Sequence, residues 1–208
     1  TNVGGQYERE LRGVLAGIPK SVEAVIRSCD DTEKNRMRQI IDRPFLVVRA
    51  AGSGMEGSGD LLVLRGDICF PIEVKSYKKD KLYLSGRTKE QYDSMVHEGQ
   101  RCGLMPLYAF RYKGVRGDSW RIFRVDVGGL TGRLGILERR IPKLPRTRNG
   151  KPFLDWNQGM PLNKFIALLC HKSKDTTISS IESRTMKIQD IPEKESSQTS
   201  IIDMVKTL

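Results

Sequence analysis

Long hydrophobic runs are missing from this sequence. It contains no stretch of about 18 consecutive apolar residues and no signal-peptide pattern, so we expect a soluble, cytoplasmic protein that does not bind membranes. Paired cysteine motifs are missing as well. The four cysteines are scattered and never spaced as C-x-x-C, which disfavours a zinc site or a disulfide framework and favours reduced thiols.

Acidic residues are too few to balance the basic ones. The chain has 36 lysines and arginines against 25 aspartates and glutamates, a net charge of +11. Residues 173–208 carry a net charge of −1, so the first 172 residues carry +12. A basic body with a nearly neutral tail favours a polyanionic partner, and nucleic acid is the expected one. The tail is rich in Ser, Thr, Lys and Glu, which predicts disorder over most of its length.

Hydrophobic periodicity predicts a mixed α/β protein in which helices and strands alternate. The expected helices cover residues 6–17, two short segments within 20–43, residues 88–101 and residues 162–170. The expected strands cover residues 45–50, 60–65, 68–75, 82–84, 104–112 and 120–127. Residues 51–59 are too rich in glycine for regular structure, and they lack the Gly-Lys-Ser/Thr ending of a P-loop, so binding of a nucleoside triphosphate is disfavoured.

The stretch from Asp60 to Lys75 carries the strongest functional signal. Two apolar runs flank an Arg-Gly-Asp turn, which is typical of two strands joined by a tight connection. Alternation along a strand places Glu73 and Lys75 on one face, and Asp60 lies beside Glu73 if the strands pair. Unpaired charges that face a sheet interior are costly, and a divalent cation such as magnesium would offset that cost. A solvated Glu–Lys pair on a strand surface is the alternative.

Four sequence blocks occur in a characteristic order. They are Gly5-Gln6-Tyr7-Glu8-Arg9-Glu10-Leu11, Val47-Val48-Arg49-Ala50-Ala51-Gly52-Ser53, Asp60-Leu61-Leu62-Val63, and Ile72-Glu73-Val74-Lys75 continued by Lys78-Lys79-Asp80-Lys81-Leu82-Tyr83. With these blocks the chain resembles archaeal-type Holliday junction resolvases, a branch of the PD-(D/E)XK nuclease superfamily. The resemblance implies a restriction-endonuclease-like core, which is a central mixed β-sheet flanked by helices, and a homodimer.

The resemblance also assigns residues to the chemistry. It implies that Glu8, Asp60 and Glu73 bind magnesium, for which manganese would substitute, with the carbonyl of Val74 as a further ligand. Lys75 would orient or help deprotonate the attacking water and support the charge that develops on the phosphate. The residues that it implies for DNA binding are Arg9, Arg49, Ser53, Lys78 and Lys79.

We therefore expect a nuclease core over residues 1–130 with a helical insertion at 18–43, a basic connector and helix over 131–172, and a disordered tail over 173–208. The segment 139–148 is rich in Arg and Pro, and we expect it either to extend along a phosphate backbone or to be a solvated linker. Near the end of the tail, Gln198 with Ile201, Met204 and Val205 faintly resembles a sliding-clamp peptide.

The function implied by the resemblance is a magnesium-dependent DNA endonuclease that resolves four-way junctions by paired symmetrical nicks, in an archaeal or viral setting. A homodimer with two active sites suits two symmetric cuts. Two alternatives stay open. One is a nuclease of the same fold that acts on another DNA substrate in restriction, repair or genome processing. The other is a DNA-binding module without catalysis, which is disfavoured because all four acidic and basic positions are retained.

Overall fold

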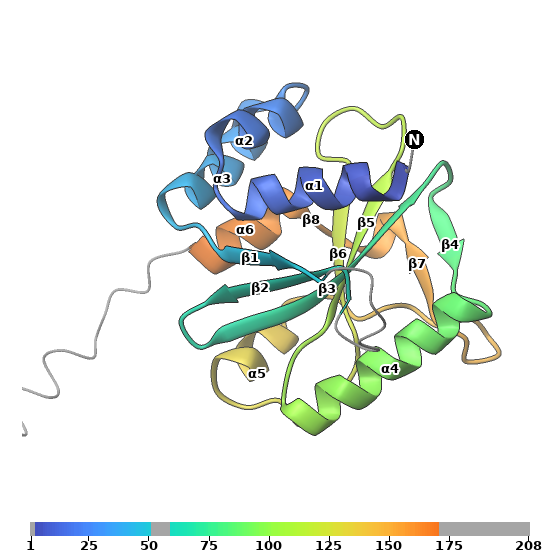
Figure 1. The fold of residues 1–208 in the computed structure, drawn as a ribbon. Helices are drawn as coiled ribbons and strands as arrows, with labels where there is room; N and C mark the ends of the chain where they lie inside the picture. The colour runs from blue at the N-terminus through green and yellow to red at the C-terminus, as the bar shows by residue number, and fades with distance from the viewer. Residues whose placement is uncertain (1–2, 51–58, 171–208) are drawn as a thin grey trace, which may run out of the picture. The chain divides into compact units, whose positions relative to one another are not determined.

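A six-stranded β-sheet with helices packed against it forms the main body of the protein. The structure, a computed structural model, describes residues 3–50 and 59–170 (Figure 1). Ser53, the rest of the glycine-rich loop, the tail and its clamp-like peptide lie outside these residues. The helices are α1 (Val3–Leu15), α2 (Pro19–Ile26), α3 (Asp31–Asp42), α4 (Arg87–Cys102), α5 (Gly132–Glu138) and α6 (Leu162–Cys170). The strands are β1 (Leu46–Arg49), β2 (Leu61–Arg65), β3 (Ile68–Tyr77), β4 (Lys81–Tyr83), β5 (Leu107–Tyr112), β6 (Trp120–Arg124), β7 (Phe153–Asp155) and β8 (Met160–Pro161).

The main sheet is mixed, as the sequence predicts. Its strand order is β1-β2-β3-β5-β6-β8, and β4 and β7 form a separate two-stranded sheet. The pairing of β3 with β5 is parallel and every other pairing of the main sheet is antiparallel. The predicted hairpin is present, because β2 pairs with β3 from Leu61↔Ile72 to Arg65↔Ile68. Its two-residue turn needs glycine at Gly66, where φ is +59°.

Side-chain alternation gives the sheet two buried faces. On β5, Leu107 and Ala109 join a core cluster with side chains from α1, α2, α3 and α6, whereas Tyr108 and Phe110 join a second cluster with side chains from α4. Figure 1 shows these helices on opposite sides of the sheet. The central strands are therefore covered on both faces, and polar groups at their ends lie between two apolar layers.

The segment 18–43 forms two helices, as expected. Helix α3 begins with a capping box in which Asp30 accepts a hydrogen bond from the Glu33 amide and the Glu33 side chain accepts one from the Asp30 amide. Met37 and Ile40 of α3 are buried, and α3 packs against α6. These two helices therefore belong to the main core.

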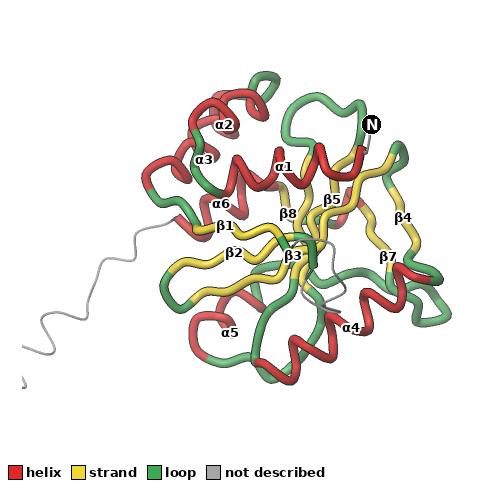
Figure 2. Tube along the Cα trace, in the orientation of Figure 1, coloured by secondary structure: helices red, strands yellow, loops and turns green. Residues whose placement is uncertain are grey.

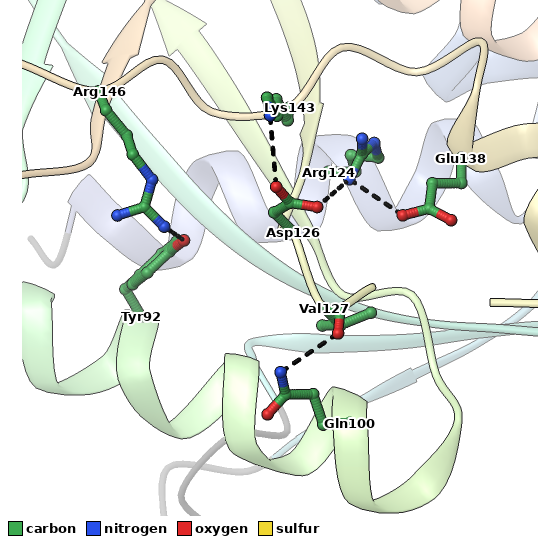
Figure 3. A network of polar contacts seen from close by, with 8 residues as sticks. All are labelled: Tyr92, Gln100, Arg124, Asp126, Val127, Glu138, Lys143 and Arg146. Carbon is green, nitrogen blue, oxygen red and sulfur yellow. Dashed lines mark hydrogen bonds and ion pairs between the residues drawn. The ribbon is translucent and has the colours of Figure 1, made fainter. Parts of the chain in front are cut away.

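The basic segment after β6 is built into the same core. Helix α5 precedes it, and within it Ile141 and Leu144 are buried, with main-chain hydrogen bonds joining it to Arg124 of β6. The expectation of a solvated linker over 139–148 is therefore wrong, because apolar side chains recur within the charged run. In Figure 3, Lys143 pairs with Asp126, and Arg146 donates a hydrogen bond to the hydroxyl of Tyr92 on α4. The chain then supplies β7 to the small sheet and β8 to the main one.

The first turn of helix α6 is hydrogen-bonded to a buried aspartate, Asp118, which was not predicted from the sequence as a structural residue. One oxygen of Asp118 accepts hydrogen bonds from the amide of Asn163 at 2.7 Å and from its Nδ2 at 2.8 Å, and the other accepts from the Trp120 amide at 3.1 Å. Asp118 is 6% exposed. No helix in the described part of the chain is long and apolar enough to cross a membrane.

We expect Asp118→Ala to lower the free energy of unfolding by about 2–4 kcal/mol, because it leaves three buried donors without an acceptor. A urea titration measures the change. The control is Asp93→Ala, which removes an exposed carboxylate paired with Lys89 and should change stability far less. Equal losses in the two variants would contradict the structural role of Asp118.

Candidate active site

The β2–β3 hairpin presents an acidic and a basic side chain together at the centre of the sheet. Glu73 and Lys75 lie two residues apart on β3 and share a face, and Lys75 Nζ lies 2.7 Å from Glu73 Oε1. Glu73 is 4% exposed and stands opposite Tyr108 of β5. The ion pair is therefore buried rather than solvated, which excludes a surface Glu–Lys pair.

Asp60 is held against β3 by main-chain contacts. Its amide donates to the carbonyl of Ile72 at 2.8 Å, and its Oδ2 accepts a hydrogen bond from the amide of Val74 at 2.7 Å. Gly59, just before it, has φ +67°, and a Cβ there would lie 2.6 Å from the carbonyl oxygen of Ile72. Only glycine fits this approach, so Gly59 lets the chain deliver Asp60 beside Glu73.

Helix α1 brings in the third carboxylate. It lies against β1, β2 and β3, and Glu8 on it is largely buried. Arg49 of β1 contacts Glu8 Oε2 through Nε at 3.0 Å and Nη2 at 2.9 Å. The two predicted site residues of the first and second sequence blocks therefore meet directly, although 41 positions separate them in the chain.

Electrostatics places the predicted catalytic residues in one neighbourhood. Burial raises the pKa of Asp60 to about 6, and the negative charges of Glu73 and Glu8 add to this rise. The Val74 amide and the positive charge of Lys75 oppose it. All four predicted catalytic side chains thus influence one carboxyl group. Asp60 is the member of the set that is left without an ion pair among residues 3–50 and 59–170.

The carboxylates face cations of the protein in this structure. Glu8 forms an ion pair with Arg49, and Glu73 forms one with Lys75. Asp60 accepts a hydrogen bond from the main-chain amide of Val74. Accordingly, no group of three or more His, Cys, Asp or Glu side chains within the described residues is gathered closely enough to hold a metal ion. The donor set still has the chemistry that suits a hard divalent cation, because it offers carboxylate oxygens with excess negative charge around Asp60.

Two residues of the site, Gln91 and Tyr108, were not predicted from the sequence. Gln91 of α4 accepts a hydrogen bond from Lys75 Nζ at 3.0 Å, so the ammonium group is held between Gln91 and Glu73. Tyr108 is fully buried, and its hydroxyl has no hydrogen-bond partner among the described residues. Burial and the charge of Glu73 raise the pKa of Tyr108. Neither residue belongs to a sequence block. The parallel pairing of β3 with β5 places Tyr108 opposite Glu73, and the packing of α4 brings Gln91 to Lys75.

The predicted DNA-binding residues lie at the surface around this site. Arg9 and Arg49 are exposed, and a Cβ placed on Gly5 would lie 3.4 Å from a guanidinium nitrogen of Arg9 and 3.8 Å from one of Arg49. The two guanidinium groups therefore gather beside the same turn of α1. Lys78 and Lys79 are exposed directly after β3. Ser53 lies outside the described residues.

A surface hollow of about 380 Å³ lies elsewhere, between α2 and the β5–β6 connection. Its lining includes Glu10, Arg27 and Arg111, and it contains none of the predicted site residues. Glu10 is occupied within the fold, because its Oε1 accepts hydrogen bonds from Trp120 Nε1 and Arg111 Nε. This hollow is therefore separate from the candidate active site around Asp60, Glu73 and Lys75.

Comparison with known proteins decides the family. The family model described as archaeal Holliday junction resolvase (Hjc) matches residues 24–131, which is more than half of the chain. The chain belongs to this family. The expected membership of the PD-(D/E)XK nuclease superfamily and the expected central mixed sheet flanked by helices are thereby confirmed. A Holliday junction resolvase from the archaeal hyperthermophile Archaeoglobus fulgidus is 21% identical, over 65% of this chain and 97% of that chain, with a TM-score of 0.43. No curated protein sequence matches the chain.

The family match does not extend over every predicted site residue. It includes Arg49, Asp60, Glu73 and Lys75, and it begins after Glu8 and Arg9. The case for Glu8 therefore depends on its contact with Arg49 and its charge near Asp60. Most of the segment expected as an insertion, residues 24–43, lies inside the match.

The raised pKa of Asp60 predicts that Asp60→Asn stabilises the metal-free protein at neutral pH. Well below pH 3.8 Asp60 is protonated in both the folded and the unfolded state, so the group has no effect there. As the pH rises from 3.8 to about 6, the unfolded state loses this proton and the folded state keeps it, so the folded wild type becomes less stable, and the full effect is present above about 6. We expect Asp60→Asn to gain about 1–3 kcal/mol at pH 7.5, a range that allows for solvent screening of a partly exposed group.

Urea unfolding in EDTA at pH 4.0 and pH 7.5 measures this difference. The gain should be full at pH 7.5, and most of it should be lost at pH 4.0, close to the ordinary pKa of 3.8. The control is Asp67→Asn, which removes an exposed carboxylate paired with Arg133. A gain of the same size at both pH values would show that charge burial at Asp60 is not its cause.

Proposed function

We propose that the protein is a metal-dependent, structure-selective DNA endonuclease that resolves Holliday junctions by paired symmetrical nicks. The observation that carries the proposal is the buried Lys75–Glu73 pair beside Asp60, within the residues that match the resolvase family. Membership of that family supports a nuclease, and the site supplies the acidic and basic groups that phosphodiester hydrolysis needs.

Magnesium is the proposed cofactor, with manganese as a substitute. Asp60, Glu73 and Glu8 would hold it, with the carbonyl of Val74 as a further ligand. Two observations support the fit: burial, together with the negative charges of Glu73 and Glu8, raises the pKa of Asp60, and the buried Tyr108 hydroxyl lacks a partner among the described residues. A hydrated cation would neutralise the negative charge around Asp60, and one of its water molecules would give the Tyr108 hydroxyl a hydrogen-bond partner. Glu8 and Glu73 would then exchange their contacts with Arg49 and Lys75 for contacts with the cation.

When bound, magnesium would lower the pKa of a water molecule and neutralise the scissile phosphate. The chain's own contribution centres on Lys75. Its ammonium group is fixed by Gln91, so it stays in the site when Glu73 turns to a cation. From there it would donate a hydrogen bond to the attacking water or to a phosphate oxygen on which negative charge develops. Gln91 acts as a positioning residue, because it contacts Lys75 and not the substrate.

The surface around the site suits a DNA backbone. Arg9 and Arg49 present two guanidinium groups beside α1, and release of Arg49 from Glu8 on metal binding would free it for a phosphate. Lys78 and Lys79 add exposed charge at the end of β3. The net charge of +12 over the first 172 residues would strengthen this contact at low salt. Two symmetrical nicks need two sites, which a homodimer would supply.

A cleavage assay on labelled DNA tests the proposal. Wild-type protein should nick a synthetic four-way junction in magnesium and should not do so in EDTA. Glu73→Gln should cut at least about a hundredfold more slowly, because the site loses a charged ligand and the partner of Lys75. The control is Glu90→Gln, which alters an exposed glutamate on α4 and should leave the rate unchanged.

The same assay separates the alternatives when flap, duplex and single-stranded DNA are run beside the junction. A junction that is cut no faster than a duplex would overturn junction resolution and favour a nuclease with another substrate. Cleavage by Glu73→Gln at the wild-type rate would overturn the catalytic assignment. Tight binding without cutting of any substrate would favour a DNA-binding module.

A further inference from the structure

The small sheet of β4 and β7 carries a stacked pair of aromatic rings, of which Tyr83 is exposed and Phe153 is half-buried. Tyr83 and Phe153 stand opposite each other across the antiparallel pair, with ring centroids 5.3 Å apart and an interplanar angle of 23°. Tyr83 is 59% exposed. The neighbouring residues point the other way: Leu154 is fully buried, and Leu82 packs against the same core cluster. We call Tyr83 and Phe153 the aromatic ribbon face.

This exposure is not required to hold the ribbon in place. The inward pair of Leu82 and Leu154 anchors the two strands to the core, and Trp156 adds a main-chain hydrogen bond to the carbonyl of Asp80 at 2.8 Å. A large ring on the solvent side contributes little to folding, and its apolar surface leaves water only when a partner covers it. The aromatic ribbon face therefore has the character of a contact surface.

The charge around the aromatic ribbon face is positive. The connections that lead into β4 and β7, together with the first residue of α4, carry five exposed basic residues, which are Lys78, Lys79, Arg87, Arg148 and Lys151. The acidic residues of residues 78–87 and 148–155 are Asp80 and Asp155. Asp155 is buried beside Lys81, and Asp80 accepts a hydrogen bond from Asn157. Aromatic rings framed by an excess of cations match a nucleic-acid strand, whose bases stack and whose phosphates attract lysine and arginine.

The aromatic ribbon face includes a strand that lies in the chain between two elements of the candidate active site, β3 and α4. Three residues separate the end of β3, which carries Glu73 and Lys75, from the start of β4. On the other side of β4, helix α4 begins at Arg87 and carries Gln91 against Lys75. Figure 2 shows β4 and β7 side by side near the beginning of α4. A strand that reaches Lys75 would therefore find this surface next to it.

We infer that the aromatic ribbon face stacks an unpaired base of a branched DNA. The inference rests on the proposed function for its substrate class, branched DNA, and it concerns branches at which a base is unpaired. Phe153 lies outside the residues that match the resolvase family, so the pair joins a matched strand to the unmatched extension. Duplex DNA, whose bases are stacked on each other, would offer no face to the ring.

Binding is measured by fluorescence anisotropy with the full chain in EDTA, so that no cleavage occurs. The two probes are a branched DNA with unpaired bases at the branch and a duplex of the same length. Tyr83→Ala should bind the branched probe about fivefold to a hundredfold more weakly and bind the duplex as the wild type does. Tyr83→Phe keeps the ring and should keep the affinity. The control is Ile136→Ala, which removes a similarly exposed apolar side chain on α5.

A 2-aminopurine placed at the unpaired position reports stacking directly. Its fluorescence should be quenched by wild type and by Tyr83→Phe, and not by Tyr83→Ala. Unchanged affinity and quenching in Tyr83→Ala would overturn the inference, and so would an equal loss of affinity for both probes. A change in sedimentation without a change in DNA binding would instead make the pair a contact between copies of the chain, which also overturns it.

The two proposals fail separately. If wild type cuts junctions while Tyr83→Ala binds the branched probe normally, the stacking surface is wrong and the nuclease assignment stands. If wild type cuts no DNA but quenching depends on Tyr83, the stacking surface stands and the nuclease assignment is wrong.

Discussion

The hydrogen bond from the Val74 amide to the Asp60 carboxylate is the contact on which the site depends. It fixes the beginning of β2 against the middle of β3, so that Asp60, Glu73 and Lys75 cannot separate without loss of the hairpin register. A slip of one residue would turn Glu73 and Lys75 to the other face. Gly59 permits this approach and Gly66 closes the turn, so two glycines with positive φ set the spacing of the acidic groups.

The close spacing of the acidic groups lowers the stability of the folded protein, and packing in the rest of the fold offsets this loss. Asp60 and Glu73 lie where two apolar layers exclude water, and Glu8 is near enough to influence Asp60. The raised pKa of Asp60 reflects first its burial and then the negative charges of these other two carboxylates. Arg49 and Lys75 balance two of them. The large cores on both faces of the sheet, extended by α6 and the segment after β6, supply the stability that tolerates this repulsion. A divalent cation would reduce this repulsion and free Arg49 from Glu8, while Gln91 would keep Lys75 in the site.

Sequence reasoning reached the hairpin and its charged face because strand alternation and a turn motif are local signals. It also reached α6 and the two helices of 18–43, whose apolar spacing is regular. It missed Gln91 and Tyr108, since Gln91 meets Lys75 and Tyr108 meets Glu73 only through tertiary packing. It left open a solvated linker over residues 139–148 because Ile141 and Leu144 are hidden among many charges. The role of the buried Asp118 could not be predicted, because its partner Asn163 on α6 lies 45 positions away in the chain.

The most direct test of the cation site is a calorimetric titration of manganese into the metal-free full chain. Wild type should bind the ion with an affinity that falls as the pH drops through about 6, because Asp60 must then lose a proton to bind. Asp60→Asn and Glu73→Gln should abolish this binding. Equal binding by wild type and Asp60→Asn, or an affinity that does not change between pH 5 and pH 7.5, would contradict the claim that these carboxylates form a cation site.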